Sequence, residues 1–146
     1  MNPTALFQID EDFLLVGTQN GKIEMWNIDA GKIVKYIDAH SESKAGISSI
    51  VELKDPSYLI RSERTELNPE IRYIVTTCFD KNEFKIWKIA PKGTHNRPDI
   101  SFHIKIETTL AGISKILQAS PSQLVCVDNH KTMKFYDFVD RVEQKK

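Results

Sequence analysis

Residues 73–89 read YIVTTCFDKNEFKIWKI: an apolar run, a polar turn, then an alternating run that ends in an aromatic residue. The same pattern occurs as FLLVGTQNGKIEMWNI over 13–28 and as QLVCVDNHKTMKFYDF over 123–138. In this alignment Trp26, Trp87 and Tyr136 occupy one equivalent position. Three copies of one pattern indicate a repeat architecture, in which neighbouring units cover each other's apolar faces.

Each of these units predicts a β-hairpin, because apolar and polar residues alternate with the period of two that a strand requires. Asn20-Gly21 is typical of a type I′ hairpin turn, in which both residues take a positive φ. The chain also contains 17 Ile, 8 Val and 9 Thr among 146 residues. These β-branched side chains favour strands, so we expect an all-β protein.

Further strands are predicted on both sides of the hairpins, which gives a unit of four antiparallel strands. The expected first strands are 5–9, 47–53 and 113–118, and the last two are approached through a shared Ala-Gly-Ile-Ser string at 45–48 and 111–114. The expected fourth strands are 32–37 and 101–107. A fourth strand in the third unit stays open, since residues 139–146 are few and charged.

The repeat resembles the WD-repeat β-propeller family over almost the whole chain. The dipeptides Trp26-Asn27, Trp87-Lys88 and Tyr136-Asp137 stand where that family has Trp-Asp, and Ala39-His40 stands where it has Gly-His. The resemblance implies propeller blades of four antiparallel strands, about three of them, in one segment spanning 1–146. The expected blades cover about 4–38, 45–108 and 112–146.

The resemblance also implies a hydrogen-bond chain of the His–Ser/Thr–Asp–Trp kind inside a blade. In the second unit its members would be His40, Thr76 or Thr77, Asp80 and Trp87. The role of such a chain is to make the blade rigid and not to carry out chemistry. We also expect Trp26 and Trp87 to be largely buried, because an indole contributes a large apolar area.

The number of blades predicts an incomplete ring unless another chain completes it, because propellers close with about four to eight blades. Either the chain is a piece of a longer propeller, or it closes with a second chain. Two copies that form a six-bladed homodimer are the simplest symmetric solution. The expected apolar end faces are the Val16, Ile23 and Met25 set and the Val125, Met133 and Phe135 set.

Two long connections in the second unit are candidates for partner binding. Residues 54–72 and 90–100 join the first strand to the second and the third to the fourth, so they emerge at the same end of the sheet. Loops on a rigid scaffold are where binding residues collect. The candidates are Tyr58, Arg61, Arg64, Lys92, His95 and Arg97. A solvated insertion without a partner is the alternative interpretation.

No pattern of catalytic or cofactor-binding residues accompanies these loops. The four His and two Cys lack metal-ligand spacing, and neither a nucleophile-elbow motif nor a Gly-rich phosphate loop occurs. Twenty basic residues balance twenty acidic ones, so charge does not indicate nucleic acid or a membrane surface as a partner. Both cysteines lie in apolar runs, which predicts reduced thiols and an intracellular, cytoplasmic location.

The sequence therefore predicts a protein–protein interaction scaffold or adaptor that is not an enzyme and holds no cofactor. An alternative is a regulatory or targeting propeller segment of a larger enzyme, or of a ubiquitin-ligase or kinase assembly. An enzyme in its own right is a third hypothesis, and it would need a base and a nucleophile in contact within a pocket.

Overall fold

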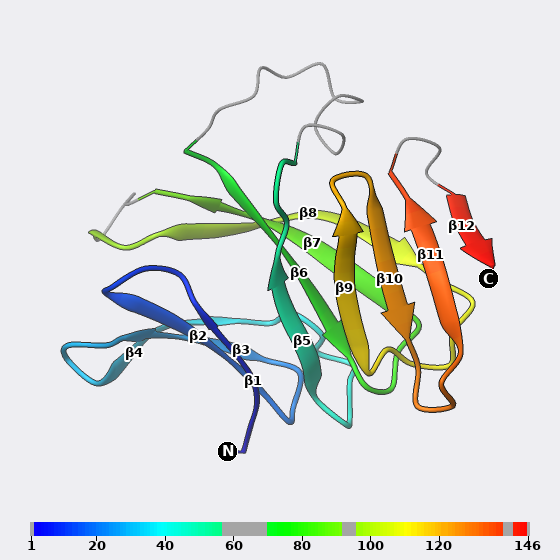
Figure 1. Ribbon diagram of the computed structural model, residues 1–146. Helices are drawn as coiled ribbons and strands as arrows, with labels where there is room; N and C mark the ends of the chain where they lie inside the picture. Colours follow the sequence, from blue (N-terminus) through cyan, green and yellow to red (C-terminus); the bar gives the residue numbers. More distant parts are fainter. Residues whose placement is uncertain (1, 57–69, 92–95, 139–141, 146) are drawn as a thin grey trace.

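The computed structural model describes residues 2–56, 70–91 and 96–138, and the backbone of 142–145. Within these residues the chain forms antiparallel strands and no α-helix, as Figure 1 shows. The strands are β1 (Pro3–Gln8), β2 (Phe13–Thr18), β3 (Ile23–Asn27), β4 (Lys32–Ile37), β5 (Ile47–Glu52), β6 (Arg72–Cys78), β7 (Glu83–Ala90), β8 (Asp99–Glu107), β9 (Lys115–Ser120), β10 (Gln123–Val127), β11 (Met133–Asp137) and β12 (Val142–Lys145).

The strands form three four-stranded sheets, each made from a continuous part of the chain. Sheet 1 has the order β1-β2-β3-β4, sheet 2 the order β5-β6-β7-β8, and sheet 3 the order β9-β10-β11-β12. The all-β class and the four-stranded antiparallel units are thus confirmed. The strand left open by the sequence is present, because β12 pairs with β11 from Asp137↔Val142 to Lys134↔Lys145.

The three sheets follow one another so that their first strands lie side by side. Strand β5 contacts β1 and β2 on one side and β9 on the other (Figure 1). Two apolar clusters fill the seams between sheets. One lies between sheets 1 and 2 and includes Leu15, Met25 and Trp87. The other lies between sheets 2 and 3 and includes Val75, Phe84 and Tyr136.

Strand register divides each sheet into two faces that recur along the chain. Leu14 pairs with Trp26, Ile74 with Trp87 and Leu124 with Tyr136, so these aromatic residues lie on equivalent faces, which we name the first face. The opposite face of each sheet is the second face. Each seam joins the second face of one sheet to the first face of the next. The repeat seen in the sequence is therefore a repeat of packing.

The expected type I′ turn at Asn20-Gly21 is wrong. Gly21 has φ 80°, but Asn20 does not take a positive φ. The amide of Gly21 donates to Thr18 O at 3.2 Å and that of Thr18 to Lys22 O at 2.9 Å, which is a three-residue loop with Gly in the left-handed position. The Asn20 side chain accepts from the Thr18 hydroxyl, which fixes Asn20 in this conformation.

The shared Ala-Gly-Ile-Ser string has one structural role in both places. A Cβ on Gly46 would lie 2.6 Å from Gln19 Cα, and a Cβ on Gly112 would lie 2.1 Å from Phe79 O. Both contacts are with the turn that joins the second and third strands of the preceding sheet. Glycine is therefore required where the chain enters a new sheet, because it lets the backbone pass against the previous one.

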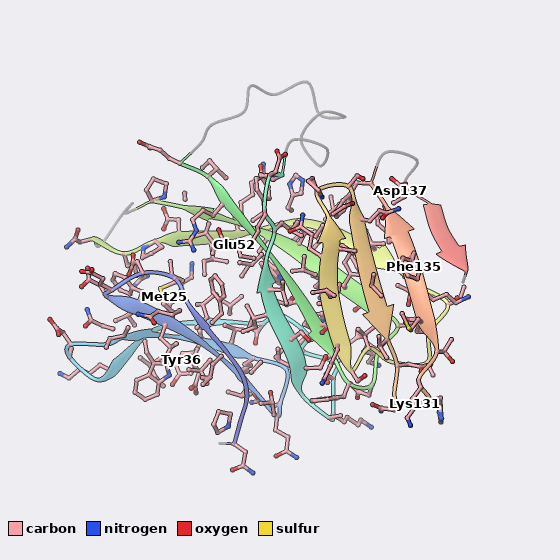
Figure 2. All side chains as sticks on the ribbon, in the orientation of Figure 1. Met25, Tyr36, Glu52, Lys131, Phe135 and Asp137 are labelled. Atoms are coloured by element: carbon pink, nitrogen blue, oxygen red, sulfur yellow. The ribbon has the colours of Figure 1, made fainter. Side chains whose placement is uncertain are left out.

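Two expectations on burial are partly wrong. Trp87 is 7% exposed, but its equivalent Trp26 is only half-buried. Ile23 and Met25 are not on an open end face, because they lie on the second face of sheet 1 and pack against sheet 2. Figure 2 shows Met25 on the side of sheet 1 that faces sheet 2, and Tyr36 on the opposite side.

Candidate functional site

Three side chains of sheet 2 and its entry loop form a buried hydrogen-bond chain. Trp87 Nε1 donates to Thr76 Oγ1 at 2.9 Å, and Thr76 Oγ1 lies 2.9 Å from His40 Nε2. Thr76 and Trp87 come from β6 and β7, while His40 lies in the loop between β4 and β5. Thr77 takes no part, because it lies on the second face and its hydroxyl is 2.6 Å from Ser48 Oγ. Three of the four expected members are thus connected.

The hydrogen-bonding capacity of Thr76 favours one tautomer of His40. Thr76 is fully buried and already accepts from the indole, so its own proton is best satisfied by donation to His40 Nε2. The imidazole then carries its proton on Nδ1. Nδ1 has no hydrogen-bond partner among the described residues. The chain therefore runs from indole N–H to hydroxyl to imidazole and ends there.

His40 is held in its neutral form. Burial lowers the pKa of His40 to about 4, and the ammonium group of Lys85 acts in the same direction. The contact with Thr76 and the charge of Asp80 oppose the shift without cancelling it. A neutral imidazole on a residue that is only 2% exposed can pack against sheet 2 without the cost of burying a charge.

Asp80 is not part of this chain, which corrects the expected four-member arrangement. Its carboxylate accepts from Ser43 Oγ at 2.5 Å and from the Lys44 amide at 2.7 Å, both in the entry loop. Although partial burial opposes ionisation, these two hydrogen bonds lower the pKa of Asp80. Ser43 Oγ also accepts from the Gly46 amide at 2.9 Å. Asp80 therefore fixes the entry loop directly and not through the imidazole.

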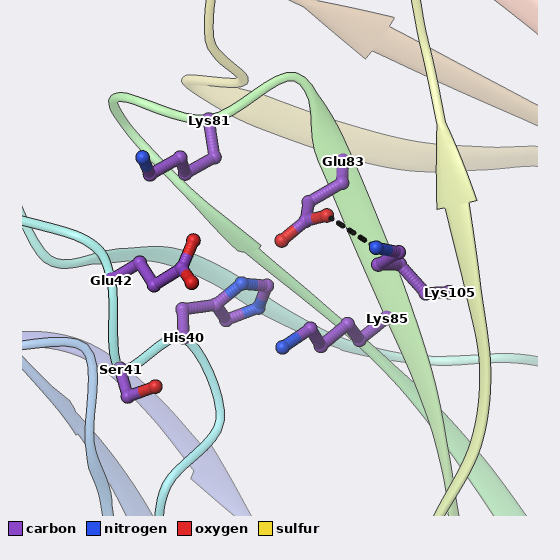
Figure 3. A pocket seen from close by; sticks show the side chains of 7 residues that line it. All are labelled: His40, Ser41, Glu42, Lys81, Glu83, Lys85 and Lys105. Atoms are coloured by element: carbon purple, nitrogen blue, oxygen red, sulfur yellow. Dashed lines mark ion pairs between the residues drawn. The ribbon is translucent and has the colours of Figure 1, made fainter.

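A small polar pocket of about 160 Å³ lies beside His40, at the end of sheet 2 where β6 turns into β7 (Figure 3). Two of its lysine side chains already have partners at the pocket. Lys85 Nζ donates to Ala39 O at 2.7 Å, and Lys105 Nζ lies 3.6 Å from Glu83 Oε2. The lining residues are His40, Ser41, Glu42, Lys81, Glu83, Lys85 and Lys105.

A second cleft of about 180 Å³ lies at the opposite end, between sheets 1 and 2, where the two long connections of sheet 2 leave β5 and β7. Arg72 organises it. Its guanidinium makes two hydrogen bonds of 2.7 Å to the Glu52 carboxylate and one of 2.6 Å to Ile9 O. It also lies 5.9 Å from the ring centroid of Phe7. The lining residues are Ile9, Asp10, Glu70, Arg72, Ile89, Ala90, Pro91 and Pro98.

Of the predicted partner-binding residues, Arg97 is the one that lies among the described residues. Arg97 is half-buried and its guanidinium donates to Val34 O at 2.9 Å, so it links the connection after β7 to sheet 1. The remaining candidates lie outside the described residues: Tyr58, Arg61, Arg64, Lys92 and His95. Arg72 and Glu52 are not among the residues identified from the sequence. They are oppositely charged residues on neighbouring strands, so a known pairing register would have indicated that they are close together.

The described residues include both cysteines and side chains of the types that bind metals. Cys78 and Cys126 are buried thiols that form no disulfide bond, and burial raises the pKa of the Cys78 thiol to about 11. In the part of the chain that the structure describes, no group of three or more His, Cys, Asp or Glu side chains could hold a metal ion. None of the described segments is a helix long and apolar enough to cross a membrane.

Comparisons with known proteins inform on the fold alone. No protein-family model and no curated protein matches the sequence. Among solved structures, the crystal structure of the computationally designed Ika4 protein is similar at a TM-score of 0.60 and 17% identity, over 99% of this chain and 71% of that one. The computationally designed Ika8 protein is similar at 0.59 and 17%, over 98% of this chain and 35% of that one. The chain thus spans about a third of Ika8.

Proposed function

We propose that this protein is a protein–protein interaction scaffold, built as a segment of a WD-repeat-type β-propeller and without catalysis of its own. The observation that carries the proposal is the His40–Thr76–Trp87 chain, which occupies positions that the family resemblance implies. The succession of four-stranded sheets with adjacent first strands also supports it. An imidazole held neutral and enclosed strengthens a scaffold and activates no nucleophile.

The partner is proposed to bind at the loop end of sheet 2. The cleft there is fixed on both sides, because Arg72 joins Glu52 of sheet 2 to Ile9 of sheet 1, and Arg97 joins the next connection to Val34. A preorganised cleft binds a partner with less loss of conformational entropy than a mobile surface does. The connections that follow β5 and β7 leave the sheet beside it.

The test is selection of binding peptides from a displayed library on the immobilised protein. Peptides that bind the proposed site should lose about tenfold in affinity, or about 1.4 kcal/mol, on Arg61→Ala with Arg64→Ala, or on Lys92→Ala. Lys81→Ala is the matched control, because it removes a lysine from the opposite end of sheet 2.

Melting temperatures of all variants should agree, so that lost binding is not lost folding. Enrichment of no peptide, or of peptides that bind the loop-end variants as well as they bind the unchanged protein, would contradict the proposal.

A further inference from the structure

Within the part of the chain that the structure describes, sheets 1 and 3 each leave one apolar face without a neighbouring sheet. On the first face of sheet 1, Leu6 is 65% and Tyr36 59% exposed, beside the half-buried Trp26. On the second face of sheet 3, Leu117 is 63% and Met133 43% exposed. These are the largest exposed apolar side chains of sheets 1 and 3. Exposed apolar side chains that share one sheet face are typical of interaction surfaces.

The register shows that these two faces are equivalent to the two halves of the seam between sheets 1 and 2. Leu6 of sheet 1 is equivalent to Ile50 of sheet 2, since the pairs Leu6↔Val16 and Ile50↔Thr76 hold the same place in the repeat. Leu117 is equivalent in the same way to Phe7, since Leu117↔Val125 matches Phe7↔Leu15. Phe7 and Ile50 belong to the same apolar cluster, the one between sheets 1 and 2.

We propose that a second copy of this chain covers both faces, with sheet 1 of each copy packed on sheet 3 of the other. The inference rests on the propeller arrangement proposed above and deepens it by naming one partner. A two-fold axis forms the new seam twice, so that no sheet face stays open. Each new seam continues the two that exist within the chain, and Leu6 meets Leu117 in it as Ile50 meets Phe7.

The area that such a dimer would bury is sufficient only if both seams form. Four strands about 4.8 Å apart and about 18 Å long present about 350 Å² of sheet face in projection. A stable interface needs about 800 Å² of accessible surface from each partner. Two faces give about 700 Å² in projection, and protruding side chains add to it. A partner that covered one face alone would stay well below this value.

The first measurement is the mass of the unchanged chain in solution by light scattering at micromolar concentration. We expect about 33 kDa, twice the 16.7 kDa of one chain. A folded species at the mass of one chain would overturn the proposal. Open-ended larger assemblies would overturn it too, because they show that the seam forms without closing.

Single substitutions then locate the interface. Leu6→Glu and Leu117→Lys should each convert the dimer to a monomer, because every copy contributes both faces and either change damages both seams. Both side chains are exposed in one chain, so strand content by circular dichroism should stay unchanged. Ser101→Glu is the matched control: it places a charge on an exposed position of the middle sheet and should leave the mass at the dimer value.

Mixing the two variants separates an interface from a folding defect. A mixed pair has one seam with both leucines unchanged and one seam in which the carboxylate introduced by Leu6→Glu faces the ammonium group introduced by Leu117→Lys. We expect an equimolar mixture to recover the dimer mass, whereas each variant alone does not. Failure of the mixture to associate would overturn the pairing of these faces. Neither result depends on peptide binding at the loop end, so this proposal and the proposed function can fail separately.

Discussion

Sheets 1 and 2 have a tryptophan at the same position, but the two indoles differ in burial and in hydrogen bonding. Trp87 is buried, and its indole N–H donates to Thr76, which is itself held by His40. Trp26 is half-buried, and its indole N–H turns to Glu24 Oε1 at 3.1 Å. The residue equivalent to Thr76 in sheet 1 is Val16, which cannot accept a hydrogen bond.

The difference shows that the aromatic residue alone does not determine how deeply it is buried or which hydrogen bond its indole makes. Sheet 2 has a neighbouring sheet on each face, and the loop that enters it carries His40 and Ser43. Among the described residues, sheet 1 has a neighbouring sheet on its second face only. The burial and hydrogen bonds of equivalent residues thus depend on the loop and the sheets packed around them.

The largest effect is expected from removing the two indoles separately. Trp87→Ala should lower the free energy of unfolding by about 3–5 kcal/mol, the usual result for a large buried aromatic side chain. Trp26→Ala should lower it by about 1–2 kcal/mol, since that ring is already partly in contact with water. Urea unfolding of both variants in the Leu6→Glu background measures this without dimer formation. Equal losses would contradict the comparison.

Lowering the pH should destabilise the protein through protonation of His40, which packs against sheet 2. The pKa of His40 is about 4 in the folded protein and 6.5 in a model peptide, so the unfolded chain binds the proton more readily. Stability should therefore fall as the pH drops from about 6.5 to about 4, by at most about 3 kcal/mol.

Unfolding measured between pH 7 and pH 4 checks this, with His40→Gln as the matched variant. The variant should be less stable at pH 7 and show a flatter pH dependence. The lowered pKa of Asp80 adds its own loss of stability only below about pH 4, where its carboxylate becomes protonated. Parallel pH profiles for the two proteins would contradict the assignment.

Much of this arrangement could be predicted from the sequence. The alternation of apolar and polar residues predicts the hairpins. Strand pairing then decides whether Thr76 or Thr77 lies beside Trp87: Ile74 pairs with Trp87, and Thr76 shares its face because it lies two residues away. The same rule places Met25 and Trp26 on opposite faces of sheet 1. The expectation that Met25 is exposed was wrong because it combined Val16, on the first face, with Ile23 and Met25, on the second face.

Other features depend on contacts far apart in the chain. Asp80 stands seven residues before Trp87, whereas Asn20 stands six before Trp26. Its carboxylate reaches Ser43 and Lys44, about 36 residues away, and no local pattern indicates such a pair. Strand β12 is charged and short, so its propensity is weak, and pairing with β11 supplies the hydrogen bonds that define it.

The entry loop of sheet 2 should be sensitive to a single methyl group. A Cβ on Gly21 would lie 1.9 Å from His40 O, and the residue has φ 80°. Gly21→Ala should therefore cost about 2–3 kcal/mol, from backbone strain and from displacement of the His40 carbonyl. Gly31→Ala is the control: φ is 61°, but nothing lies within 4 Å, so only the strain of about 1 kcal/mol remains. Thermal unfolding of the pair distinguishes the clash from the strain.

The smallest effects are expected from exchanging the residues that distinguish the two tryptophan sites. Thr76→Val keeps the shape of the side chain but leaves the Trp87 N–H and His40 Nε2 without their common partner, at a cost of about 1–2 kcal/mol. Val16→Thr adds a hydroxyl on the face that carries Trp26, but the imidazole of His40 contacts Thr76 and not this site. It should change stability by less than about 0.5 kcal/mol, because the indole already has Glu24 as acceptor.

Urea unfolding of both variants, with the tryptophan indole N–H resonances followed by NMR, measures the two sites independently. If Val16→Thr stabilised sheet 1 as much as Thr76→Val destabilised sheet 2, the hydroxyl alone would account for the difference between the sites, and the entry loop that carries His40 would contribute nothing to it.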